Sequence, residues 1–285
     1  MDRHKANSII AVLLMMFAVY YAAVVFDVCG PVAAQQSETL VIEPITPAAV
    51  PTPAVASEKL TALSPRVSDI GVSTVFGTEF PALKPGQILI QRHMYTAAID
   101  PVAKQPVWIQ FRVCRADWDS GNVLSRNFHT PAALKPFALE ESDYRESGFD
   151  MGHMYGLQFV SAATHAAEVN EVTVIAAQRP ELNRQLWVQM ENRIKDWSKT
   201  RPVDVLNGLL WIDPMPPLPN ADEPHKLASH FWAIVSPKGQ PTEAYLFDQN
   251  NLGGNNAVDN FKVGVTDLKE IVSDNWTSTL EGANK

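Results

Sequence analysis

The strongest constraint on the fold is a proline-rich stretch between residues 35 and 75. Prolines stand at positions 44, 47, 51, 53 and 65, among many Ala, Thr and Ser residues. Each proline fixes its own φ and restricts the residue before it, so neither a helix nor a central strand can run through this spacing. We therefore expect residues 35–75 to form an extended linker, which confines the globular domain to residues 76–285.

The segment before the linker has the features of a targeting signal. The basic start Arg3-His4-Lys5 precedes an apolar run of 18 residues, 9–26, and Val32-Ala33-Ala34 offers small residues for cleavage. A run of that length is enough to span a bilayer. Residues 1–34 are therefore expected to be a signal peptide or an N-terminal membrane anchor, and in the second case residues 9–26 would attach the protein to the membrane. Either alternative predicts an exported protein, periplasmic or extracellular.

Composition limits the classes of function that remain. The 285 residues, 46% of them hydrophobic, are enough for one sizeable core. The chain carries 23 Lys and Arg against 31 Asp and Glu, a formal net charge of -8. A protein that coats nucleic acid through a broadly basic surface has the opposite balance, so a nucleic-acid function must depend on a local site. Two cysteines are too few for a disulfide scaffold.

The pattern of apolar residues predicts strands and helices without a regular alternation. The expected strands are 87–92, 107–113, 172–176, 205–212, 231–235 and 244–247, of which the first two form a hairpin through the turn 100–106. Apolar residues spaced four, four and three apart, from Leu186 to Trp197, predict a helix over 183–199 that buries one face. A last helix is expected from Thr266 through Val272. This order favours an α+β fold with a mixed or antiparallel central sheet flanked by helices.

One short motif and one helix contain the residues suited to catalysis. His153 follows Gly152 on a turn or strand end, in the sequence Ser-Gly-Phe-Asp-Met-Gly-His from residue 147. Asn183 and Glu191 lie eight residues apart on the predicted helix, just over two turns along one side. An amide oxygen and a carboxylate in that arrangement suit Mg²⁺, which takes oxygen ligands and keeps several waters. Arg92, at the end of the first strand, is available to bind a phosphate.

These residues resemble the signature of the DNA/RNA non-specific endonucleases of the ββα-metal class. That family has Asp-Arg-Gly-His after a Ser-Gly-aromatic lead-in, and this chain has Asp-Met-Gly-His at residues 150–153. The resemblance extends from about Phe76 to Leu280, and the matching positions outside the motif are Arg92, Tyr95, Trp108, Gln178, Leu182, Asn183, Trp187 and Glu191. The family likeness implies a ββα-metal motif beside the central sheet.

The resemblance implies a role for each site residue. His153 would be the general base, Asn183 would hold Mg²⁺, or Mn²⁺ in its place, and Glu191 would hold the waters of the metal. Arg92 and Lys195 would contact the phosphate, while the structural support would come from Asp150, Gly152 and Gln178. The implied activity is cleavage of DNA and RNA without sequence specificity. The oligomeric state is not predicted.

Departures from the family pattern leave a second hypothesis open. Met151 stands in place of the motif arginine and cannot donate to a phosphate, and Lys195 lacks the bidentate fork of an arginine. The alternative is therefore a catalytically weakened nuclease fold that acts as a nucleic-acid-binding or interaction module. Simpler roles also stay open for three residues: Asn183 could cap the helix, Glu191 could be solvated, and Arg92 could pair with an acidic residue.

Overall fold

The computed structural model describes residues 83–84, 86–118, 125–160, 163–254 and 257–275. They all belong to one of the two units into which the chain divides, Glu38–Lys285. Within the described residues, no helix is both long and apolar enough to cross a membrane. The expected signal peptide or anchor and the expected linker lie outside these residues, as does the apolar run 9–26.

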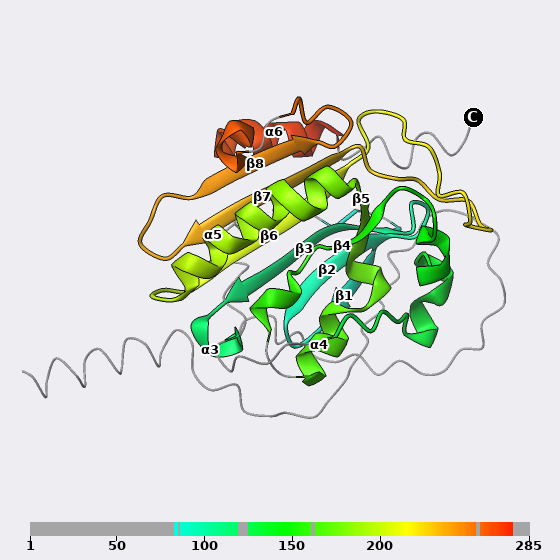
Figure 1. Ribbon diagram of the computed structural model, residues 1–285, viewed down its shortest axis with the longest axis horizontal. Helices are drawn as coiled ribbons and strands as arrows, with labels where there is room; N and C mark the ends of the chain where they lie inside the picture. The colour runs from blue at the N-terminus through cyan, green and yellow to red at the C-terminus, as the bar shows by residue number, and fades with distance from the viewer. Residues whose placement is uncertain (1–82, 85, 119–124, 161–162, 255–256, 276–285) are drawn as a thin grey trace, which may run out of the picture. The chain divides into compact units, whose positions relative to one another are not determined.

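A seven-stranded sheet forms the centre of the described domain (Figure 1). The strand order is β1-β2-β3-β6-β7-β8-β9, and each neighbouring pair is antiparallel. The strands are β1 (Ile88–Gln91), β2 (Tyr95–Asp100), β3 (Gln105–Val113), β6 (Val203–Leu210), β7 (His230–Pro237), β8 (Glu243–Asp248) and β9 (Lys262–Val263). The expected α+β class with an antiparallel central sheet is confirmed.

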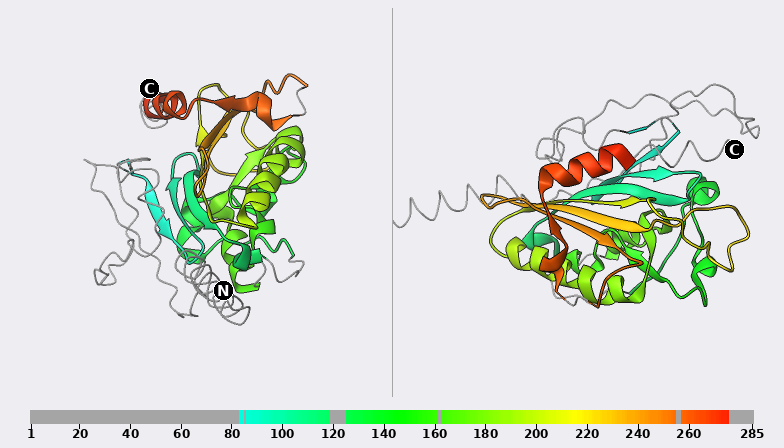
Figure 2. Two further views of the ribbon diagram at one scale, coloured as in Figure 1. Left: turned by 90° about the vertical axis from the view of Figure 1, so that its left-hand side faces the viewer. Right: turned by 90° about the horizontal axis from the view of Figure 1, so that it is seen from above.

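Helices cover both faces of this sheet, α5 on one side and α6 on the other (Figure 2). Alternate residues of one strand therefore enter different cores: Phe231 and Val235 of β7 pack toward α5, whereas Trp232 packs toward α6. This double coverage explains why the central strands are apolar at nearly every position. The helices are α3 (Arg115–Trp118), α4 (Ala163–Val169), α5 (Val188–Ser198) and α6 (Val265–Asn275), and 3-10 turns cover 132–137, 141–144, 157–159, 172–174 and 258–261.

Two expectations about the strands were wrong. The segments 87–92 and 107–113 do not pair with each other, because β2 lies between them and pairs with both. The Ala97-Ala98 pair in β2 has low strand propensity, so its buried position in the sheet was not evident locally. The expected strand 172–176 begins instead with a 3-10 turn, and the strand β5 runs from Ile175 to Gln178.

A second, two-stranded ribbon carries the Asp-Met-Gly-His motif. The motif is strand β4 (Asp150–His153), which pairs antiparallel with β5 (Ile175–Gln178). The chain then enters a helix at Pro180, which passes through a π-helical segment, Leu182–Trp187, and continues as α5. The consecutive ribbon and helix form a ββα unit at the side of the central sheet.

Candidate functional site

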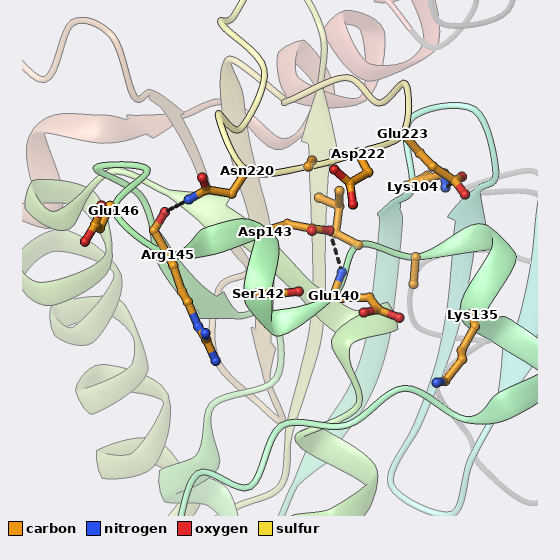
Figure 3. Close-up of a pocket in the computed structure, with 13 residues that line it drawn as sticks. Lys104, Lys135, Glu140, Ser142, Asp143, Arg145, Glu146, Asn220, Asp222 and Glu223 are labelled. Atoms are coloured by element: carbon orange, nitrogen blue, oxygen red, sulfur yellow. Dashed lines mark hydrogen bonds and ion pairs between the residues drawn. The ribbon is translucent and has the colours of Figure 1, made fainter.

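One hollow on the surface of the described domain contains none of the expected site residues. It has a volume of about 620 Å³ and is lined mainly by charged side chains of both signs (Figure 3). Lys104 and Glu223 form an ion pair at its edge, and Asn220 donates to the carbonyl of Arg145. Its lining carries three cationic and five anionic side chains, and this excess of negative charge does not favour binding of a phosphate.

A second hollow is a cleft of about 540 Å³ at the ββα unit. It is lined by Arg126 from the irregular segment after α3 and by residues of the motif strand, of the loop that follows it and of the first turns of the helix: Asp150, Met151, His153, Gly156, Leu157, Gln158, Asn183, Arg184, Val188 and Glu191. The structure thus brings together four of the expected site residues, His153, Asn183, Glu191 and Asp150. This cleft is the candidate active site.

His153 is held in one orientation and one tautomer. Its Nε2 atom lies 2.8 Å from Oδ1 of Asn170, and Nδ2 of Asn170 donates to the carbonyl of Ser125 at 3.1 Å. Because the amide nitrogen of Asn170 is already used as a donor, its oxygen faces the ring and Nε2 carries the proton. The Nδ1 lone pair is then available to accept a proton. Burial, with only 8% of the residue exposed, lowers the pKa of His153 to about 4 and keeps the ring neutral.

Asn183 is oriented by a side chain of the motif. Its Nδ2 atom donates to Oδ2 of Asp150 at 2.9 Å, so its Oδ1 atom points away from that carboxylate. Arg184 donates to both oxygens of the same Asp150, at 2.8 and 2.6 Å, and this guanidinium holds the pKa of Asp150 below its usual range. Helical backbone begins before Asn183, whose own N–H donates to the carbonyl of Arg179. Asn183 therefore does not cap the helix.

The π-helical segment affects how Asn183 and Glu191 face the cleft. Eight residues of regular α-helix turn through about 800°, which would leave the two side chains about 80° apart around the axis. A π-helical turn contains more residues, so it reduces this rotation. Both side chains line the cleft as a result.

Glu191 is enclosed rather than solvated. Gln158 donates to its Oε2 atom at 3.0 Å, and a Cβ atom on Gly156 would lie 2.5 Å from its Oε1 atom. Burial raises the pKa of Glu191 to about 7. A carboxylate kept from water in this way is stabilised in its charged form by a nearby cation.

The remaining support residues pack under the motif. Gln178 is fully buried, and a Cβ atom on Gly152 would lie 2.0 Å from Oε1 of Gln178. Glycine is required at position 152 because the side chain of Gln178 occupies the space beside it. Trp187 adds a hydrogen bond from its indole N–H to the carbonyl of His153.

Two residues that were expected to bind phosphate do not line the cleft, so the prediction that they belong to the site was wrong. Arg92 forms a bidentate ion pair with Glu171, at 2.7 and 2.8 Å, and does not line the cleft. The alternative that Arg92 pairs with an acidic residue therefore describes the structure. Lys195 places its ammonium group 4.6 Å from the ring centroid of Trp118 and also lies outside the cleft lining.

Sequence reasoning missed three residues of the site. Arg126 and Arg184 line the cleft, and Asn170 binds the His153 ring. Arg126 stands in a polar, irregular segment with no periodicity to assign its direction. Arg184 follows Asn183 directly, which was the one available signal. His153 and Asn170 are seventeen residues apart, a spacing that matches no recognisable sequence motif, and only folding brings their side chains together.

A separate group of potential metal ligands lies outside the cleft. One ligand atom from each of Asp213, His230 and Asp248 lies within 4.8 Å of the others. The pairing of β7 with β8 places His230 beside Asp248, and Asp213 follows the end of β6. The three positions are too far apart in the chain to form a recognisable sequence motif.

Comparisons with known proteins point to one family. The model of the family described as DNA/RNA non-specific endonuclease matches residues 73–279. A protein from Serratia marcescens named Nuclease is 27% identical over 179 residues, which cover 59% of this chain and 66% of that protein. The match thus spans slightly less than two thirds of that relative.

A solved structure shows the same fold. A chain from the crystal structure of the EndoG/EndoGI complex, a study of the mechanism of EndoG inhibition, aligns with a TM-score of 0.60. The alignment covers 74% of this chain and 90% of that chain at 20% identity. The likeness agrees with the antiparallel sheet and the helices described above.

Proposed function

Because the chain belongs to the DNA/RNA non-specific endonuclease family, we propose that it hydrolyses phosphodiester bonds of DNA and RNA, with His153 as the general base. The observation that carries this proposal is the fixed tautomer of His153. Nε2–H of His153 donates a hydrogen bond to Oδ1 of Asn170, so Nδ1 is the basic atom of a ring that lines the cleft. A neutral imidazole is suited to accept a proton from water.

The proposed step conserves atoms and charge. Nδ1 of His153 takes a proton from a water molecule, and the water oxygen forms a bond to phosphorus. The bond from phosphorus to the 3′ oxygen breaks, the electron pair stays on that oxygen, and solvent supplies its proton. The products are a 5′-phosphate and a 3′-hydroxyl. No 2′-OH takes part, so the same residues can act on DNA and on RNA.

The donor set of the cleft fits a hydrated magnesium ion. Oδ1 of Asn183 is directed away from Asp150 by the hydrogen bond of its own amide nitrogen, and Glu191 adds a carboxylate in the same cleft. Oxygen donors in small number, with room for water, suit Mg²⁺, and Mn²⁺ has similar requirements. When bound, the ion would supply Lewis-acid stabilisation of the charge on the phosphate and on the leaving oxygen.

Arg126 replaces Arg92 as the proposed phosphate-binding arginine. Its side chain lines the cleft, and its charge acts on His153, Asp150 and Glu191. A guanidinium in this position can neutralise charge that builds on the phosphate in the transition state. Arg92 instead holds Glu171, the neighbour of Asn170, and so supports the residue that orients His153.

We also propose that the enzyme acts outside the cytoplasm. The proposal is supported by the basic start, the apolar run 9–26 and the proline-rich segment that follows it. Exported nuclease activity would serve scavenging of nucleic acid or defence. DNA and RNA are the proposed partners.

The test compares the purified full chain with two histidine variants. Plasmid DNA and RNA are incubated with wild type, His153→Ala and His129→Ala, each with Mg²⁺ and with a chelator. We expect wild type and His129→Ala to cleave both substrates only with metal. His129 is a matched control because its exposed ring lies outside the cleft lining.

Equal cleavage by wild type and His153→Ala contradicts the proposal. Metal-dependent binding without cleavage supports the weakened module instead.

A further inference from the structure

The cleft has few positive charges for a site that binds phosphate. Among its lining residues, Arg126 and Arg184 are the only arginines or lysines, and His153 is held neutral. Met151 occupies the motif position where the related endonucleases have an arginine. Its thioether lines the cleft and packs against the apolar cluster that contains Ile175 and Ala177, so it cannot donate to a phosphate.

Arg184 has the geometry to supply the missing contact. Its Nε and Nη2 atoms donate to Asp150, and its side chain is nevertheless 69% exposed. A guanidinium has five N–H donors, so this pair leaves three donors of a cleft-lining, largely exposed side chain for another acceptor. The bidentate pair also fixes the plane of the guanidinium, which reduces the entropy lost when a phosphate binds.

Arg184 also lies beside the proposed metal ligand. Oδ2 of Asp150 accepts hydrogen bonds from both Arg184 and Asn183. A phosphate near Asn183 would therefore be within reach of the free donors of Arg184. The ion pair between Arg184 and Asp150 lies at the surface and contributes little to the free energy of unfolding. Stability alone therefore does not explain why Arg184 is held beside Asn183.

We propose that Arg184 binds the scissile phosphate in place of the motif arginine that Met151 replaces. The inference rests on the proposed function of the cleft and names the residue that restores its charge. The competing explanation is that Arg184 only positions Asp150 and, through it, Asn183. That explanation predicts weaker metal binding, whereas a phosphate contact predicts weaker binding of nucleic acid at an unchanged metal requirement.

The first experiment is a cleavage assay on a double-mutant cycle. The full-length variants are Arg184→Ala, Met151→Arg and the two combined, with Arg201→Ala as a charge-matched control beyond the far end of α5. We expect Arg184→Ala to lower kcat/KM by about 10- to 100-fold, with the Mg²⁺ concentration for half-maximal rate unchanged. In the Met151→Arg background the same change should cost less than about 3-fold, because the two arginines share one role. A shift in the Mg²⁺ requirement with unchanged KM overturns the inference.

The second experiment measures binding without cleavage, so that it does not depend on activity. The affinity of His153→Ala for a short DNA duplex in Mg²⁺ is measured at several salt concentrations, with and without Arg184→Ala. Loss of one phosphate contact should reduce the slope of log K against log salt by about 0.9, and Arg201→Ala should leave it unchanged. Equal slopes for the Arg184 and Arg201 variants overturn the inference. If wild type does not cleave but the slope falls with Arg184→Ala, the proposed function fails and the phosphate contact stands.

Discussion

At the scale of single residues, the hydrogen bond between His153 and Asn170 decides which ring nitrogen is basic. The amide of Asn170 is fixed by its own bond to Ser125, so the proton of the imidazole stays on Nε2. The same enclosure that fixes the tautomer also removes the ring from water. The enclosure therefore gives His153 a catalytic orientation, but it also makes the folded state less stable when the solution becomes acidic.

The low pKa of His153 predicts how the free energy of unfolding depends on pH. The folded pKa of His153 is about 4, below the usual 6.5, so between these values the unfolded chain binds the proton more tightly. Acidification from pH 6.5 to 4 should therefore destabilise the folded state, by about 3 kcal/mol from this residue. Urea unfolding of wild type and His153→Gln at pH 7 and pH 4 measures the difference. An equal loss of stability in both proteins contradicts this account, and His129→Gln serves as the control.

At the scale of elements, the β4–β5 ribbon is packed too closely for a side chain at position 152. Gly152 and Gln178 lie on adjacent strands, and the Gln178 side chain occupies the position of the missing Cβ. The ribbon in turn holds Asp150, which orients Asn183 at the start of the helix. The pairing of two short strands thus sets the position of the proposed metal ligand.

A double-mutant cycle tests this packing. Gly152→Ala should lower the free energy of unfolding by about 1–3 kcal/mol, because Gln178 must leave its position. Adding Gln178→Ala should recover part of that loss, since the small side chain makes room for the new Cβ. Chemical unfolding of the single and double variants measures the coupling, and strictly additive effects would rule out the contact as the cause.

At the scale of the whole domain, the central sheet separates the site from the core beneath α6. Leu268 and Val272 of α6 pack on one face of the sheet, and the helix that carries Asn183 and Glu191 packs on the other. Both faces must be covered for the sheet to be stable, yet only one face carries the cleft. Stability and activity can therefore be changed separately.

The variant Leu268→Ala is expected to change stability without changing activity. The side chain is fully buried, so its truncation should lower the free energy of unfolding by about 2–5 kcal/mol. The rate of cleavage under conditions where the variant is folded should match wild type, because no residue of α6 is among those that line the cleft. Glu270→Ala, exposed on the same helix, is the control for both measurements. A large loss of kcat in a folded Leu268→Ala protein would show that the two faces are coupled.

The sequence identified those site residues that are marked by a local motif or helix spacing, and missed those that depend on contacts with distant segments. His153, Asn183 and Glu191 were identified from the sequence because a motif and one helix place them at fixed spacings. Arg126 and Asn170 could not be identified, because only the folded loop and the ribbon bring them to the His153 ring. Arg92 was misplaced since a strand end does not reveal that a buried Glu171 lies within reach of its guanidinium.

The sequence alone determined the α+β class, the helix that follows the motif and the apolar strands of the central sheet, because these depend on residue spacing within one segment. Tertiary structure decided what depends on distant segments: the insertion of β2 between two expected neighbours, the ion pair of Arg92 and the partner of His153. It also decided that Arg184 faces the cleft, because the direction of an exposed side chain is set by its partner Asp150, thirty-four positions earlier in the chain.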